Sequence, residues 1–125
     1  MIHHVALETR FEDAQACVAF YALLGFARVE PPETLRDRAV WLALGAQQLH
    51  LLLTDEPDVP PQGHVAVVLG DYEAAIARAR ERGCRRVELD TNETNTPALA
   101  LYHRFGFSER AKGEDRSLFL QLPLT

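Results

Sequence analysis

Three histidines stand where strands of a predicted sheet would bring their imidazoles together. His4 and His64 each begin a His-Val-Ala tripeptide in a segment of alternating residues, and His50 lies in the alternating segment 47–53. Because successive side chains of a strand point to opposite faces, His4 and His64 each share a face with the alanine two residues later. Imidazoles suit borderline divalent metals such as Zn, Ni, Fe or Mn. The three histidines therefore predict a metal site with open positions for a substrate.

Gln121 is a fourth candidate ligand, with weaker chemistry. It lies in the predicted strand 117–123, on the face opposite the leucines of that strand. A neutral amide is a poor metal ligand, and a strand histidine taken alone is more often a hydrogen-bonded structural residue. The ligand interpretation therefore depends on the histidines acting together. His3, which should face the helices, and His103, on a predicted helix, are predicted to be non-ligands.

The elements that position His4 and His64 are two copies of one unit. Gly-x-x-Arg-Val-Glu recurs at 25–30 and 83–88, and each copy follows a His-Val-Ala strand and a helical segment. A repeated strand–helix–strand unit predicts a pseudo-symmetric arrangement, with the two histidines in equivalent places.

The rest of the chain completes an α+β pattern. The first copy has a strand at 2–8, a helix at 12–24 and a strand at 26–30, and the second has a strand at 64–69, a helix at 72–82 and a strand at 84–90. Gly45-Ala46 joins a hairpin of strands 39–44 and 47–53, and a proline-rich connector occupies 54–63. A third helix capped by Thr94 or Asn95 precedes two last strands at 107–111 and 117–123.

These elements predict one α+β domain over residues 1–125. A βαβββ-type module should occupy residues 1–57, and an atypical βαβ-α-ββ module should occupy 63–125. We expect a mixed, curved sheet with the helices on its outer face.

Bulk properties narrow the choice of partner to a small-molecule substrate. The net charge of −5 disfavours nucleic acid or an anionic membrane surface as the main partner. The chain has no apolar run long enough to span a bilayer and no signal-peptide pattern. Two cysteines without a CxxC motif indicate a reduced, cytoplasmic compartment.

The His-Val-Ala strand and the segments AFYALLGF, QQLHLLL and GHVAVVLGDYEAAIARARERG resemble the vicinal oxygen chelate superfamily. That group includes glyoxalase I, fosfomycin-resistance proteins, extradiol dioxygenases and bleomycin-resistance proteins. The resemblance covers about residues 1–88 and implies paired βαβββ modules around a divalent metal, with His4, His50, His64 and Gln121 as ligands by position. It also implies a homodimer and a metal-assisted reaction of the lyase, isomerase or dioxygenase type on a substrate with two neighbouring oxygens.

One alternative is a metal-free binding protein of the same superfamily. Gln121 takes the place of the family's glutamate ligand, and the family's Asp-Pro-x-Gly turn is absent. Some members of the superfamily bind small molecules without any metal. The sequence does not single out a catalytic base.

A second resemblance covers residues 79–124, which are similar to the C-terminal part of GCN5-related N-acetyltransferases. It rests on the run Leu-Asp-Thr-Asn-x-x-Asn-x-x-Ala-x-x-Leu-Tyr and the following Gly-Phe. It implies that Asn95 lies beside acetyl-CoA and that Tyr102 is the general acid for the leaving thiolate. The same residues also fit a helix cap and a packed helix residue. Asp71 and Glu73 would repel phosphate at the start of the preceding helix.

Overall fold

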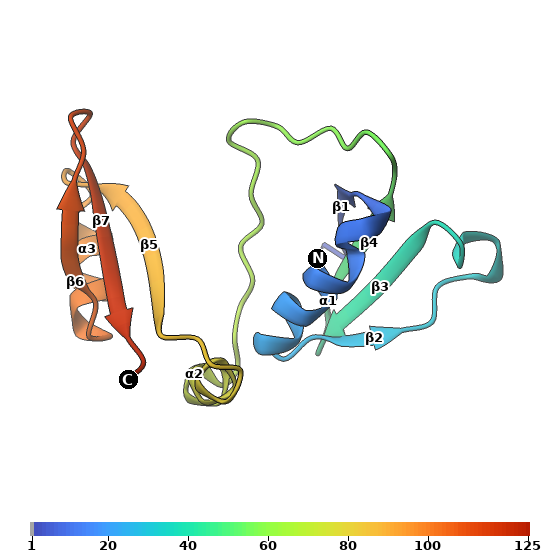
Figure 1. The fold of residues 1–125 in the computed structure, drawn as a ribbon, viewed down its shortest axis with the longest axis horizontal. Helices are drawn as coiled ribbons and strands as arrows, with labels where there is room; N and C mark the ends of the chain where they lie inside the picture. The colour runs from blue at the N-terminus through green and yellow to red at the C-terminus, as the bar shows by residue number, and fades with distance from the viewer. Residues whose placement is uncertain (1) are drawn as a thin grey trace. The chain divides into compact units, whose positions relative to one another are not determined.

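The computed structural model describes residues 2–125, which divide into two compact units, the first ending at Ala75 and the second beginning at Ile76. Each unit contains its own open sheet, of four strands in the first and three in the second (Figure 1). The described residues therefore have the α+β architecture that the sequence predicts. Within this part of the chain, no helix combines the length and the hydropathy needed to cross a membrane.

The first sheet has the strand order β1-β4-β3-β2 and is mixed. β1 and β4 are parallel, whereas β4 and β3, and β3 and β2, are antiparallel. Its strands are Val5–Thr9 (β1), Ala27–Val29 (β2), Ala39–Leu44 (β3) and Gln47–Leu53 (β4). The β3–β4 hairpin turns at Gly45, whose φ of 57° lies in the left-handed region that glycine adopts without steric cost. The predicted hairpin is confirmed.

Helix α1 (Ala14–Leu23) packs its side chains on one face of this sheet. The sequence predicts the helix but not which of its sides is buried, and the apolar residue Phe20 is 56% exposed. Gln15 is the only polar residue of α1, so the spacing of apolar residues does not distinguish one side of the helix from another. The core cluster consists of Phe26, Val40, Leu42, Leu49 and Leu51, with Cys17, Val18, Tyr21 and Leu24 packed against it.

The strand predicted at 64–69 is wrong. Residues 63–69, here called the strap, form no strand ladder. The side-chain amide of Gln47 holds the strap instead: its Nε2 donates to the carbonyl oxygen of Val68 at 2.8 Å, and its Oε1 accepts from the Val68 N–H at 2.9 Å. Val65 and Val67 pack against the core cluster. Valines at alternating positions indicate that one side of the segment is buried. An extended segment without a paired neighbour can show the same alternation as a strand.

We expect Gln47→Glu to loosen the strap while the sheet stays intact. A carboxylate accepts from the Val68 N–H but cannot donate to its carbonyl, so one hydrogen bond is lost at a cost of about 1 kcal/mol. Amide hydrogen exchange at Val68, whose N–H is bonded to the Gln47 side chain, should become faster, whereas exchange at Leu51, in the middle of β4, should not change. Unchanged exchange along the strap would show that the Gln47 contact does not hold it.

Helix α2 (Tyr72–Glu81) begins and ends close to the predicted positions. The Asp71 carboxylate caps it, because Oδ1 accepts from the Ala74 N–H at 2.8 Å. Its small and apolar side chains Ala75, Ile76 and Ala79 are buried.

The second sheet has the order β5-β7-β6 and is antiparallel throughout. Its strands are Arg86–Asn92 (β5), Ser108–Lys112 (β6) and Ser117–Pro123 (β7), and helix α3 (Thr96–Arg104) lies between β5 and β6 in the chain. Asn95 caps α3, with Oδ1 accepting from the Ala98 N–H at 3.4 Å. The predicted cap, helix and last strands are confirmed. The core of this unit consists of Phe107, Leu118 and Leu120, with Val87, Leu89, Leu99, Tyr102 and Leu122 packed against it.

Candidate functional site

His4 and His50 meet on the sheet face opposite α1. β1 places Ala6 opposite His50, and β3 places Trp41 opposite His50 from the other side. The His50 ring lies between two other rings, with its centroid 4.0 Å from that of His4 and 3.9 Å from that of Trp41, and both pairs are stacked. The structure thus brings two of the predicted site residues into contact and adds an indole. We call Trp41, His50 and His4 the ring column.

His50 is the enclosed member of the ring column, with 5% of its surface exposed. Its Nε2–H donates to Oε1 of Gln48 at 3.0 Å, because an amide oxygen can only accept. Burial lowers the pKa of His50, and the neighbouring His4 and His3 lower it further. The His50 imidazole is therefore neutral at pH 7, with its remaining lone pair on Nδ1.

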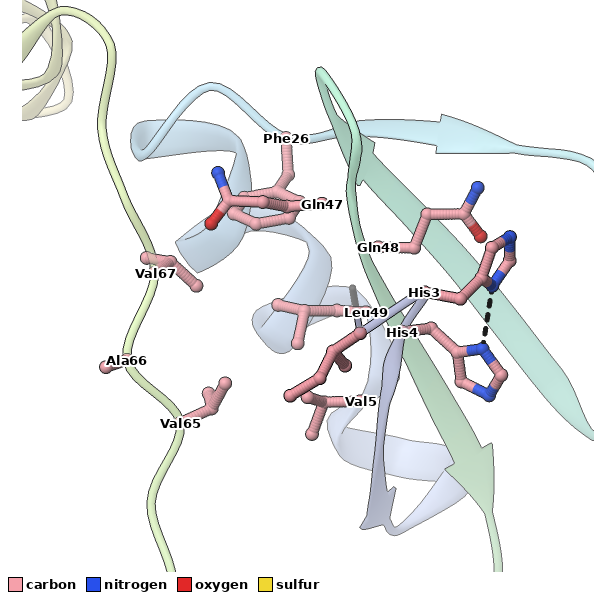
Figure 2. A pocket seen from close by; sticks show the side chains of 11 residues that line it. His3, His4, Val5, Phe26, Gln47, Gln48, Leu49, Val65, Ala66 and Val67 are labelled. Atoms are coloured by element: carbon pink, nitrogen blue, oxygen red, sulfur yellow. Dashed lines mark hydrogen bonds between the residues drawn. The ribbon is translucent and has the colours of Figure 1, made fainter.

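His3 joins this site, although the sequence placed it on the helix side of the sheet. Its Nδ1 lies 2.9 Å from Nδ1 of His4, and the two rings meet edge to face (Figure 2). β1 begins only at Val5, so the alternation of a strand does not extend back to His3. One of the two Nδ1 atoms must carry the shared hydrogen. In the neutral pair, one of the two Nε2 atoms is therefore a donor and the other an acceptor.

His64 belongs to the first unit but not to the ring column, and Gln121 belongs to the second unit. His64 makes no ring contact with the described residues, and its Nδ1–H donates to the carbonyl of Gln62 at 3.1 Å. His64 lines a cavity of about 410 Å³, together with Glu8 and Asp58, and none of the rings of the ring column lines it. Gln121 lies on β7 in the second unit, where the strand register places it between Glu88 and Ser108.

The arrangement of the histidines does not fit a metal ion. The rings of His4 and His50 are 16° from parallel, so their in-plane lone pairs do not converge, whereas ligands of one ion must all reach it at about 2.1 Å. Nδ1 of His4 and Nε2 of His50 are also engaged in hydrogen bonds. Within residues 2–125, no group of three or more His, Cys, Asp or Glu side chains is placed to hold a metal. Binding of Zn, Ni, Fe or Mn stays a prediction.

The two residues suggested by the acetyltransferase resemblance have structural roles. The Asn95 oxygen caps α3. Tyr102 packs against the core of the second unit, with its ring centroid 6.1 Å from that of Phe107. Their roles towards acetyl-CoA stay predictions.

Among solved structures, the chain is similar to a glyoxalase family protein from Bacillus anthracis. The TM-score is 0.58, with 20% sequence identity over 73% of this chain and 75% of that chain. The fold is glyoxalase-like. At this identity the glyoxalase-like fold alone is established. No curated protein matches the chain.

A sequence profile also matches, that of the acetyltransferase (GNAT) family, over residues 72–107. This span contains α2, β5 and α3. Both resemblances in the sequence therefore have support, one in the glyoxalase-like fold and the other in this shorter segment.

Trp41 is the site residue that the sequence reasoning missed. The hairpin turn at Gly45-Ala46 fixes the pairing of β3 with β4, and that pairing places Trp41 opposite His50. Counting outward from the predicted turn would have found it.

Proposed function

We propose that the glyoxalase-like first unit is a metal-independent small-molecule binding module whose ligand stacks on His4. The ring column carries this proposal. His50 is buried and Trp41 half-buried, but His4 is exposed at the end of the column, where a further ring can stack. A stacked aromatic pair contributes about 0.5–1.5 kcal/mol beyond the area that it buries.

The hydrogen-bonding groups around His4 favour a planar, neutral ligand that carries both a donor and an acceptor. His3 and His4 share one hydrogen, so their two Nε2 atoms offer one donor and one acceptor. A carboxamide on an aromatic ring has both groups and a flat face. A ligand of this class needs no metal to orient it. The competing function, a metal-dependent reaction on an oxygen-chelating substrate, needs three converging ligands.

Benzamide is a suitable probe, and Trp41 is a built-in reporter, because the chain has no other tryptophan. We expect a saturable change of Trp41 fluorescence with benzamide in the presence of EDTA. Cyclohexanecarboxamide, which has the same amide on a non-planar ring, should bind more weakly. His4→Ala should weaken benzamide binding about tenfold, since it removes the ring on which the ligand stacks.

His64→Ala is the matched control, because His64 lies outside the ring column, and it should leave benzamide binding unchanged. Equal benzamide affinity in the wild-type protein and in His4→Ala would overturn the proposal. Binding that occurs only after a divalent metal is added back would overturn its metal independence.

Acetyl-CoA binding is a second candidate, favoured by the family match over residues 72–107. A helix N-terminus binds phosphate through its free N–H groups. At α2, the Asp71 carboxylate already accepts from the Ala74 N–H, and Glu73 adds negative charge to the first turn. We therefore expect acetyl-CoA to leave the melting temperature unchanged. A saturable rise in Tm with acetyl-CoA would make this candidate the better assignment.

A further inference from the structure

A second cavity lies between the start of the described chain, β4 and the strap, and His3 and His4 are among its lining residues. Its volume is about 170 Å³. Figure 2 shows the side chains of Val5 and Leu49 directed towards the strap, whereas the rings of His3 and His4 are directed away from it. The apolar side chains of the wall are those of Ile2, Val5, Phe26, Leu49, Val65 and Val67.

The polar residues that line this cavity are His3, His4, Gln47 and Gln48, and each has a partner. The Nδ1 atoms of His3 and His4 share a hydrogen bond of 2.9 Å. Both polar atoms of the Gln47 amide are bonded to the backbone of Val68, and Oε1 of Gln48 accepts from His50. Phe26 and Leu49 at the base of the cavity are 5% and 2% exposed, so the base is formed by side chains of the core cluster. The cavity therefore offers chiefly apolar contact.

The rim of the cavity is apolar as well. Ile2 is 79% exposed and Val5 is 36% exposed. The strap forms the opposite wall and is tied by the side chain of Gln47. A segment held by few hydrogen bonds opens locally at low cost, which gives a ligand a route of entry.

We propose that this cavity is a binding site for a small apolar ring of the size of benzene or toluene, distinct from the stacking face of the His4 ring. The volume is close to that of apolar cavities that bind benzene, and most of the lining is apolar. The strap would move to admit the ring and then close over it.

Toluene titration followed by methyl NMR tests this proposal directly. In the wild-type protein, the methyl signals of Val65 and Val67 should shift saturably with toluene. Val5→Phe fills the cavity and should weaken toluene binding at least about tenfold, because the ring takes the ligand's place. Leu52→Phe places the same ring on the opposite face of the sheet and should leave binding unchanged.

Val67→Phe fills the same cavity from the strap side. It replaces Val5→Phe in the toluene titration if Val5→Phe does not fold. His4 lines the cavity, but its ring is directed away from the strap, so His4→Ala should change toluene binding little and weaken benzamide binding about tenfold. Absence of a saturable shift in the wild-type protein would overturn the proposal. So would unchanged toluene affinity in a folded, cavity-filled variant.

Discussion

Leu51→Ala should lower the unfolding free energy of the first unit by about 2–5 kcal/mol, the usual cost of emptying a packed leucine site. Leu51 is 1% exposed and belongs to the core cluster under α1. Leu52, the next residue along β4, is 39% exposed and points to the opposite face. Leu52→Ala should therefore cost less than about 1 kcal/mol.

Urea unfolding followed by Trp41 fluorescence measures both variants, because Trp41 lies in the first unit. The same strand parity that buries Leu51 places His50 on the face of the ring column. Equal losses at Leu51 and Leu52 would contradict this parity, and with it the placement of the candidate site.

The first unit should also lose stability as the pH falls below about 6.5, the pKa of an unperturbed histidine. Burial, and then His4 and His3, lower the pKa of His50 in the folded protein. Below the unfolded pKa, the unfolded chain therefore binds more protons than the folded one. The unfolding free energy therefore rises with pH up to the pKa of His50 in the unfolded chain. It is lost as the pH falls through that pKa.

His50→Phe tests the origin of this acid loss, because phenylalanine keeps a ring between His4 and Trp41 but cannot bind a proton. The stability of this variant should depend less on pH below about 6.5 than that of the wild-type protein. His64→Phe is the control and should keep the wild-type dependence. The comparison uses urea unfolding of each protein over a series of pH values. An identical acid loss in His50→Phe would show that His50 is not its origin.

Local patterns in the sequence predicted the elements that depend on local interactions. The hairpin at Gly45-Ala46 is set by its own turn, and the caps at Asp71 and Asn95 by hydrogen bonds within four residues. The alternation of side chains along a strand also predicted that Leu120 lies on the face of β7 opposite Gln121. Leu120 is buried in the core there, with 0% of its surface exposed.

The features that depend on distant partners were not predictable in the same way. The second His-Val-Ala tripeptide repeats the sequence of the first, but a strand also needs a neighbouring strand edge, and the strap is tied by a side chain instead. His64 therefore does not share a site with His4. His3 was assigned to the wrong side because it precedes the first residue of β1. The buried side of α1 could not be chosen from a segment with one polar residue.

The central claim is that the ring column serves a small-molecule site without a metal. Elemental analysis of the untagged chain of residues 1–125, after incubation with Zn²⁺ and dialysis, tests it most directly when the wild-type protein is compared with the His4→Ala/His50→Ala double variant. We predict metal well below one ion per chain in both proteins, with no difference between them. One tightly held ion per chain in the wild-type protein, lost in the double variant, would contradict the account.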